Sequence, residues 1–103
     1  MIQFLKSLFG FGPKINFQEV IINGGQIIDV RSKSEYQSGH IENAINIPLD
    51  NINNNIEKLN KNIPIITCCA SGMRSESAKQ ISLSKGFKEV YNGGGWISLR
   101  NKI

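Results

Sequence analysis

Cysteine and histidine are scarce in this chain of 103 residues, which contains two cysteines and one histidine. The cysteines, Cys68 and Cys69, are neighbours, so they cannot form the framework of a disulfide-stapled secreted domain. No other cysteine or histidine lies at zinc-ligand spacing from them, and we expect neither a metal site nor a cofactor. The adjacent thiols instead favour thiol chemistry in a reducing compartment, so a cytoplasmic protein is predicted.

The chain also lacks a basic stripe, although its formal net charge is +4 and its pI is about 9.3. Its lysines and arginines are scattered and do not alternate with aromatic residues, which argues against a nucleic-acid partner. The positive charge is better explained by solubility, with a mild attraction to small anions.

A long hydrophobic run is missing as well. The most apolar stretch, from Ile2 to Phe11, is interrupted by Lys6, is too short to span a bilayer and is followed by no small-residue cleavage site. Residues 1–12 are therefore predicted to form an apolar helical extension that packs on the domain or lies at a surface. Contact with a membrane surface through this segment is the less favoured interpretation.

The remaining residues, 13–103, suffice for one hydrophobic core and contain no internal repeat or long linker, so a single domain is predicted. Short apolar runs alternate with helical segments, which is typical of an α/β domain around a mainly parallel sheet flanked by helices. Strands are expected near residues 15–17, 26–30, 44–47, 63–68 and 89–91. Helices are expected near residues 18–22, 34–38, 51–59 and 75–85. Ser34 is expected to cap the second helix and Gly86 to end the last one.

The predicted fold places the functional site beyond the carboxyl ends of the strands, so residues just after Val30, Ile47 and Cys68 should meet. Cys69 is at the centre of that region. Residues 65–75 read as a buried strand that turns through small residues and a glycine into a helix. At such a turn successive backbone N–H groups can face one concavity, and the positive end of the helix adds to them. The turn therefore suits an anion.

A thiol in that field should ionise more readily than a free cysteine, because the N–H groups and Arg74 stabilise the thiolate. The thiolate is the nucleophilic form, which makes Cys69 the candidate catalytic residue. The alternative is that Cys69 is a small buried hydrophobic residue at the end of a core strand. The local pattern alone leaves both interpretations open.

Two blocks of sequence carry more information. Residues 69–75 read Cys-Ala-Ser-Gly-Met-Arg-Ser, and residues 29–48 contain, in order, Asp-Val-Arg, Glu-Tyr, Gly-His-Ile and Asn-Ile-Pro. The first block resembles the active-site Cys-x-x-Gly-x-Arg-Ser segment of the rhodanese family, and the second resembles its upstream signature. Residues 90–96 are similar to the family's ending, in which a strand runs into a glycine-rich turn and an aromatic residue. The resemblance covers about residues 15–100.

The resemblance implies a small rhodanese-like domain with about five strands. It also implies a thiosulfate sulfurtransferase in which Cys69 carries a sulfane sulfur as a persulfide. The donor is then a small sulfur anion, thiosulfate or a persulfide, and the acceptor is a thiol, on a protein or a small molecule, or cyanide in an assay. The implied substrate-binding residues follow Cys69 directly: Ala70, Ser71, Gly72, Met73, Arg74 and Ser75.

Several side chains near these blocks have both a functional and a structural interpretation. Arg74 either supplies a positive charge for an anionic donor or is a solvated side chain of the first helical turn. Asp29 and Arg31 could act as an acid and base pair, but a structural ion pair that supports the loops is favoured. His40 is more readily explained as a support of its turn than as a general base. Cys68 is read as a buried strand residue, with redox protection of Cys69 as the alternative.

Two other functions compete with sulfur transfer. A cysteine phosphatase or arsenate reductase would resemble Cys-x-x-x-x-x-Arg, whereas four residues separate Cys69 from Arg74, which makes a tighter loop. A non-catalytic rhodanese-like binding or regulatory module is the second alternative, although such modules are those that lack the cysteine. Sulfur transfer is therefore the favoured prediction.

Overall fold

A computed structural model describes residues 15–103; the predicted extension over residues 1–12 lies outside that range. The sheet contains four strands, which are β1 (Gln26–Asp29), β2 (Ile45–Asn46), β3 (Ile65–Cys69) and β4 (Val90–Gly95). They lie in the order β2-β1-β3-β4, and every neighbouring pair is parallel. The protein is an α/β domain, as predicted.

The prediction of a fifth strand over residues 15–17 is wrong. Phe17 instead begins the helix α2 (Phe17–Ile22), and the side chain of Asn16 caps it by accepting a hydrogen bond from the Glu19 N–H at 3.1 Å. Asn is among the best N-cap residues, and its signal outweighs the short apolar run around it. The sheet therefore starts at β1.

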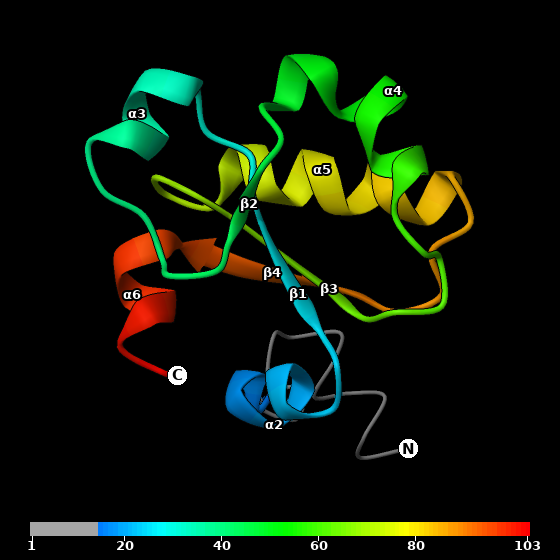
Figure 1. The fold of residues 1–103 in the computed structure, drawn as a ribbon, viewed down its shortest axis with the longest axis horizontal. Helices are drawn as coiled ribbons and strands as arrows, with labels where there is room; N and C mark the ends of the chain where they lie inside the picture. The colour runs from blue at the N-terminus through cyan, green and yellow to red at the C-terminus, as the bar shows by residue number, and fades with distance from the viewer. Residues whose placement is uncertain (1–14) are drawn as a thin grey trace, which may run out of the picture.

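Helices cover both faces of the sheet (Figure 1). One face packs against α5 (Met73–Ser84) and the α4 region, and the other against α2 and α6 (Trp96–Arg100). The α4 region is less regular than the single helix predicted over residues 51–59. It is divided into the 3₁₀ turn η1 (Leu49–Asn51), the short helix α4 (Ile52–Asn55) and the 3₁₀ turn η2 (Ile56–Lys58).

Two helix ends differ in their details from the prediction. The helix α3 (Lys33–Gln37) is capped by Ser32, two residues earlier than the expected Ser34. Ser32 and Glu35 form a capping box, in which each side chain binds the backbone N–H of the other residue. The helix α5 ends before Gly86, as expected, and Gly86 is in the left-handed region at φ +100°.

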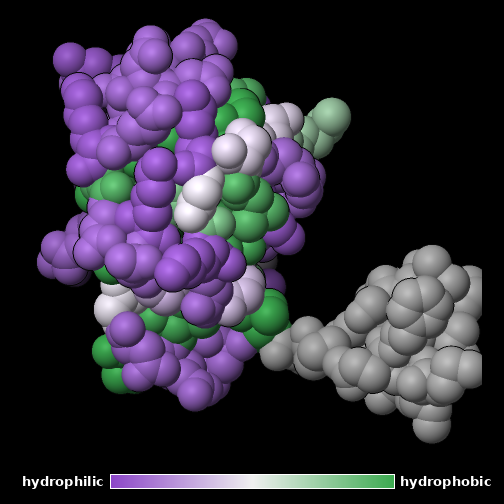
Figure 2. All heavy atoms as spheres, turned by 90° about the vertical axis from the view of Figure 1, so that its right-hand side faces the viewer, coloured by the Kyte–Doolittle hydropathy of each residue, from purple (hydrophilic) through white to green (hydrophobic). Residues whose placement is uncertain are grey.

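The carboxyl ends of the strands lie at the same end of the sheet, where α3 and the start of α5 also lie (Figure 1). Figure 2 shows the opposite end of the domain, where β3 begins and α5 ends. Hydrophilic side chains cover most of this surface, with smaller hydrophobic patches between them. Within residues 15–103, no helix is both long and apolar enough to cross a membrane.

Candidate active site

Cys69 is the last residue of β3, a strand whose five residues are all buried. The register between β3 and β4 shifts at this point, because Thr67 pairs with Asn92 while Cys69 pairs with Gly95. The Thr67 hydroxyl donates to the Ser75 carbonyl at 2.8 Å, which ties the strand to the first turn of α5. The position of Cys69 is therefore fixed by its strand, by the loop that follows it and by the first turn of α5.

The chain folds back over the Cys69 sulfur between the strand and the helix. Gly72, the N-cap of α5, has a φ of +108°, a conformation that side chains with a Cβ rarely adopt. This turn brings the N–H of Gly72 to 2.9 Å and the N–H of Ser75 to 3.4 Å from the sulfur, and Ser75 Oγ lies 3.5 Å away. The loop is thus lined with donors for a negative charge, as the sequence pattern predicts.

These donors decide the protonation of Cys69. Burial raises the pKa of the thiol, but the hydrogen bond between the thiol and the Ser75 hydroxyl, together with those from the N–H groups of Ser75, Gly72 and Ser71, outweighs burial. The net result is a pKa below the ordinary value. Since the thiolate is the nucleophilic form, the lowered pKa makes Cys69 the candidate nucleophile of the site.

Cys68 has a different environment, although it is the adjacent residue. It packs with Phe17, Ile66 and Leu99 on the α2 and α6 face, whereas Cys69 belongs to the cluster on the α5 face. Burial, and after it the charge of Asp29, raises the pKa of Cys68 to about 12. Its thiol is therefore neutral at physiological pH, as suits a buried strand residue.

The remaining loop residues differ in exposure. Ala70 and Ser71 are exposed, and Met73 is the most exposed of them at 81%. Ser75 is fully buried, and its hydroxyl donates to Asn92 Oδ1 at 2.6 Å. Contact of these loop residues with a substrate stays a prediction. The structure places Gly72 and Ser75 within hydrogen-bond distance of the Cys69 sulfur.

Asn92 is a component of the site that sequence reasoning missed. Its Oδ1 accepts from the Ser75 hydroxyl and from the Gly94 N–H at 2.9 Å, and its Nδ2 donates to the Gly72 carbonyl at 3.3 Å and to Glu76 Oε1 at 3.1 Å. Asn92 therefore links the glycine-rich end of β4 to the Cys69 loop. The only sequence signal was its place at the end of a predicted strand, where polar residues often serve a site.

The glycines after Asn92 allow the close approach of β4 to the loop. A Cβ at Gly95 would lie 2.8 Å from the Ala70 carbonyl oxygen, and one at Gly93 would lie within 3.0 Å of Leu99, Ile66 and Thr67. A side chain at either position would push β4 away from β3. The glycine run is thus a requirement of the packing around Cys69.

Arg74 points to the rim of the loop and is not free. Its guanidinium forms a two-point ion pair with Glu35 of α3, at 2.7 Å and 3.0 Å. The Arg74 hydrogen bond and the Ser32 N–H lower the pKa of Glu35 to about 2, so the carboxylate is charged at neutral pH. The structure therefore joins Arg74 to the upstream block, a contact that neither block reveals alone.

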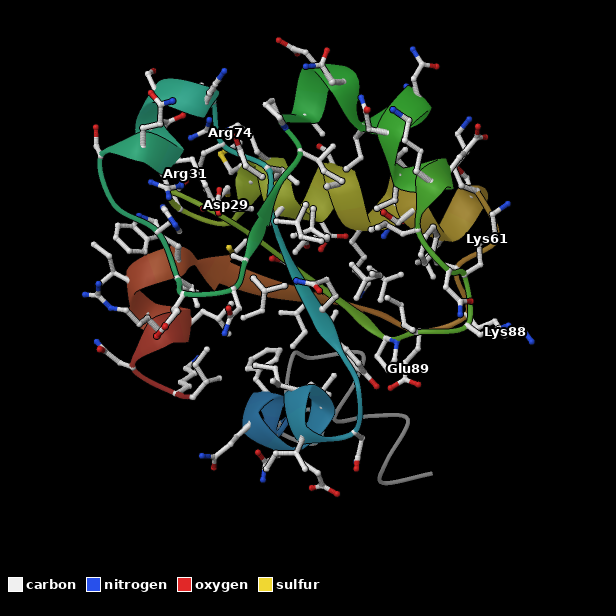
Figure 3. The ribbon with its side chains drawn as sticks, viewed as in Figure 1. Asp29, Arg31, Lys61, Arg74, Lys88 and Glu89 are labelled. Atoms are coloured by element: carbon white, nitrogen blue, oxygen red, sulfur yellow. The ribbon has the colours of Figure 1, made fainter. Side chains whose placement is uncertain are left out.

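Asp29 and Arg31 form a buried ion pair at the same end of the sheet as Arg74 (Figure 3). Arg31 donates to both carboxylate oxygens of Asp29, at 2.7 to 3.1 Å, and to the carbonyls of Glu35 and Gly39. Its guanidinium also lies 4.6 Å from the centre of the Trp96 ring. These contacts connect the end of β1 to α3 and α6, which is the arrangement that a supporting role requires.

His40 lies in the turn after α3, where its ring stacks on Tyr36 with a centroid distance of 3.7 Å. Its Nδ1 is 2.7 Å from the Tyr36 carbonyl oxygen. The contacts are those of a side chain that supports its own turn. Within residues 15–103, no group of three or more His, Cys, Asp or Glu side chains is arranged to hold a metal ion.

The profile of the Rhodanese-like domain matches residues 16–99 of this sequence. The chain belongs to this rhodanese-like family. The match includes all four strands and the Cys69 loop, so the fold and the resemblance of residues 69–75 point to the same assignment.

Individual rhodanese-like relatives share about a third of their residues with this chain. The Bacillus subtilis protein YrkF is 37% identical over 86 residues, which cover 84% of this chain and 44% of YrkF. The thiosulfate sulfurtransferase GlpE of Coxiella burnetii is 36% identical over 66 residues, which cover 64% of this chain and 62% of GlpE. The match thus spans 44 to 62% of the length of these two curated relatives.

A solved structure described as a rhodanese with anions from E. coli is 35% identical to this rhodanese-like chain. It superposes with a TM-score of 0.69 over 73% of this chain and 91% of the other. A human single-domain sulfurtransferase, TSTD1, superposes with a TM-score of 0.74 at 22% identity, which shows a shared fold.

Proposed function

We propose that this rhodanese-like chain is a sulfurtransferase that carries a sulfane sulfur on Cys69 as a persulfide. The main support is the placement of the Cys69 sulfur 2.9 Å from the Gly72 N–H and close to the N–H and hydroxyl of Ser75. GlpE, a relative at 36% identity, is named as a thiosulfate sulfurtransferase. The geometry supports the reaction, because it combines a thiol of lowered pKa with N–H groups that face the position of a negative charge.

The first step loads the sulfur. The Cys69 thiolate attacks the outer sulfur of thiosulfate, a new S–S bond forms, the S–S bond of the donor breaks, and sulfite leaves with the electron pair. With a persulfide donor, R–S–SH, the leaving group is the thiolate R–S⁻. In both cases one S–S bond replaces another, so the step needs no external oxidant or reductant.

The second step unloads the sulfur. An acceptor thiolate, or cyanide in an assay, attacks the outer sulfur of the Cys69 persulfide, and Cys69 leaves again as a thiolate. The N–H groups of Gly72 and Ser75 face the position of this charge in both steps, so they need not reorient as the reaction proceeds. A thiol acceptor on a protein or a small molecule fits the reducing environment of the cytoplasm, the location that we propose.

The test is turnover of thiosulfate and of a small persulfide with cyanide as acceptor. We expect Cys69→Ser to lose activity by about 10³-fold or more, because the nucleophile is removed. Cys68→Ser is the matched control, since it removes the neighbouring thiol, and it should retain turnover. Absence of turnover and of sulfur loading in the unchanged protein with either donor would contradict the proposal and favour the binding-module alternative.

A further inference from the structure

Charge is nearly absent from the loop that closes over Cys69. Of the residues from Ala70 to Ser75, Arg74 is the one with a charged side chain. The exposed members, Ala70, Ser71 and Met73, offer no cation to an incoming donor. The charge available to a substrate at this loop therefore depends on what surrounds Arg74.

Glu35 neutralises the charge of Arg74 by forming an ion pair with it. The two side chains form a two-point ion pair at 2.7 Å and 3.0 Å, and each is a little more than one third exposed. The carboxylate is itself held in place, because Glu35 Oε1 also accepts from the N–H and the hydroxyl of Ser32, each at 3.0 Å. The α3 capping box thus fixes the negative charge at the rim, next to the one cation of the loop.

One further carboxylate lies beside this pair. A cleft of about 140 Å³ beside Arg74 is also lined by Asp50 of η1. The other arginine at this end of the sheet, Arg31, is buried and paired with Asp29 (Figure 3). Arg100 lies over the Trp96 ring, on the face of the sheet opposite α5.

We infer that Glu35 is a specificity-determining residue that disfavours dianionic donors and directs the site toward persulfides. Thiosulfate brings two negative charges to a loop whose single cation is neutralised, and it loses hydration on entry. The outer sulfur of a persulfide, R–S–S⁻ or R–S–SH, brings at most one negative charge, for which the N–H groups of Gly72 and Ser75 suffice. This inference rests on the proposed sulfur transfer.

The reaction assigned to the persulfide donor is balanced within the site. The Cys69 thiolate attacks the outer sulfur of R–S–SH, the donor S–S bond breaks, and R–S⁻ leaves with the electron pair. Cys69 becomes the persulfide, and R–S⁻ takes a proton from water according to its own pKa. Glu35 acts only through the charge of Arg74, so it changes which donor is accepted and leaves the nucleophile unaltered.

The experiment compares kcat/KM for thiosulfate and for the persulfide of N-acetylcysteine methyl ester, whose tail is uncharged. The unchanged protein should use the persulfide with the higher kcat/KM. Glu35→Gln should raise kcat/KM for thiosulfate about three- to tenfold, chiefly through KM, and change the persulfide value less than about twofold. The gain should shrink as salt is added, because the exposed charge is screened.

Two further variants separate this effect from damage to the fold. Glu57→Gln removes an exposed ion pair of the same kind, with Lys85 at 3.2 Å, and should leave the ratio of the two donors unchanged. Asp50→Asn removes a carboxylate beside Arg74 without touching the capping box, and should raise the thiosulfate value by about twofold. Both variants are checked by thermal unfolding.

The outcomes distinguish the two levels of the proposal. If neither donor loads sulfur on the unchanged protein, the proposed function fails. If both donors load but Glu35→Gln and Asp50→Asn leave the donor ratio as it was, the assignment of Glu35 is overturned while sulfur transfer stands. Equal changes for both donors in Glu35→Gln would likewise assign Glu35 a purely structural role.

Discussion

Cys68 and Cys69 are adjacent in the chain, yet they occupy two different chemical environments. Cys68 points into the cluster with Phe17, Ile66 and Leu99, and burial raises its pKa to about 12. Cys69 points to the other face of the sheet, where donors from the loop and α5 lower its pKa in spite of burial. Exposure does not separate them, since they are 0% and 1% exposed.

The comparison teaches that hydrogen-bond donors, rather than exposure, lower the pKa of a thiol here. Successive residues of a strand face opposite sides of the sheet. Cys68 therefore faces a hydrophobic cluster, whereas Cys69, one residue later, faces a turn lined with N–H groups. The same step takes the chain from the interior of the strand to the carboxyl end of the sheet. The difference between the two cysteines can be tested by changing each environment separately.

The largest expected effect is selective alkylation. At pH 7, iodoacetamide should label Cys69 more than about 10²-fold faster than Cys68, because the thiolate is the reacting form and a pKa near 12 leaves Cys68 protonated. The Cys69 rate should reach half of its maximum at a lower pH than the rate of a free cysteine measured alongside. Peptide mapping after timed labelling measures both rates, and equal rates would contradict the account.

Asp29→Ala removes the buried Asp29–Arg31 ion pair, whose carboxylate acts on Cys68. This change leaves the buried Arg31 without its partner, and we expect the free energy of unfolding to fall by about 3–5 kcal/mol. Chemical denaturation measures the change, and Glu57→Ala, which breaks an exposed pair, should cost less than about 1 kcal/mol. In the folded variant the alkylation profile of Cys69 should stay in place, and a large shift would link Asp29 to the site.

Loss of one hydrogen-bonding group beside Cys69 should reduce the difference in pKa between the two cysteines. Ser75→Ala removes the hydroxyl near the sulfur, so the Cys69 pKa should rise and its alkylation at pH 7 should slow by up to about tenfold. The matched control is Ser82→Ala on the same helix, a buried serine whose hydroxyl donates to the Ala78 carbonyl. If both variants shift the profile equally, the effect comes from α5 as a whole.

The smallest effect is expected for Cys68→Ala. It removes one buried sulfur from the α2 and α6 face, so the free energy of unfolding should fall by about 1 kcal/mol, while turnover changes less than about twofold. Denaturation and the cyanide assay measure the two quantities. A loss of turnover after exposure to oxidant that is specific to this variant would instead assign Cys68 the protective redox role.

Some of the site could be predicted from the sequence because it is contiguous. Residues 69–75 hold both the sulfur and the groups that contact it, so a strand, a glycine and a following helix sufficed to predict a turn lined with N–H donors. The parallel sheet was equally readable, since its core strands β1 and β3 are short apolar runs between turn residues. Local signals of this kind depend on neighbouring residues alone.

Other features depend on contacts between distant residues and could not be predicted. Glu35 and Arg74 are 39 positions apart, and Asn92 reaches Ser75 across 17 positions, so neither contact leaves a local pattern. The false strand near residues 15–17 came from a three-residue stretch with apolar residues on either side of Asn16, which suits a strand or a helix start equally well. The α4 region was predicted as one helix because its isoleucines keep helical spacing through three shorter turns.

The most direct test of the account is intact mass and peptide mapping after treatment with a sulfane-sulfur donor. The protein should gain about 32 Da, one sulfur, on the peptide that contains both cysteines, and Cys68→Ala should still gain it while Cys69→Ser should not. Addition of cyanide should remove the gained mass. A sulfur that persists in Cys69→Ser, or a protein that gains none from either thiosulfate or a persulfide, would contradict the claim that Cys69 is the sulfur carrier.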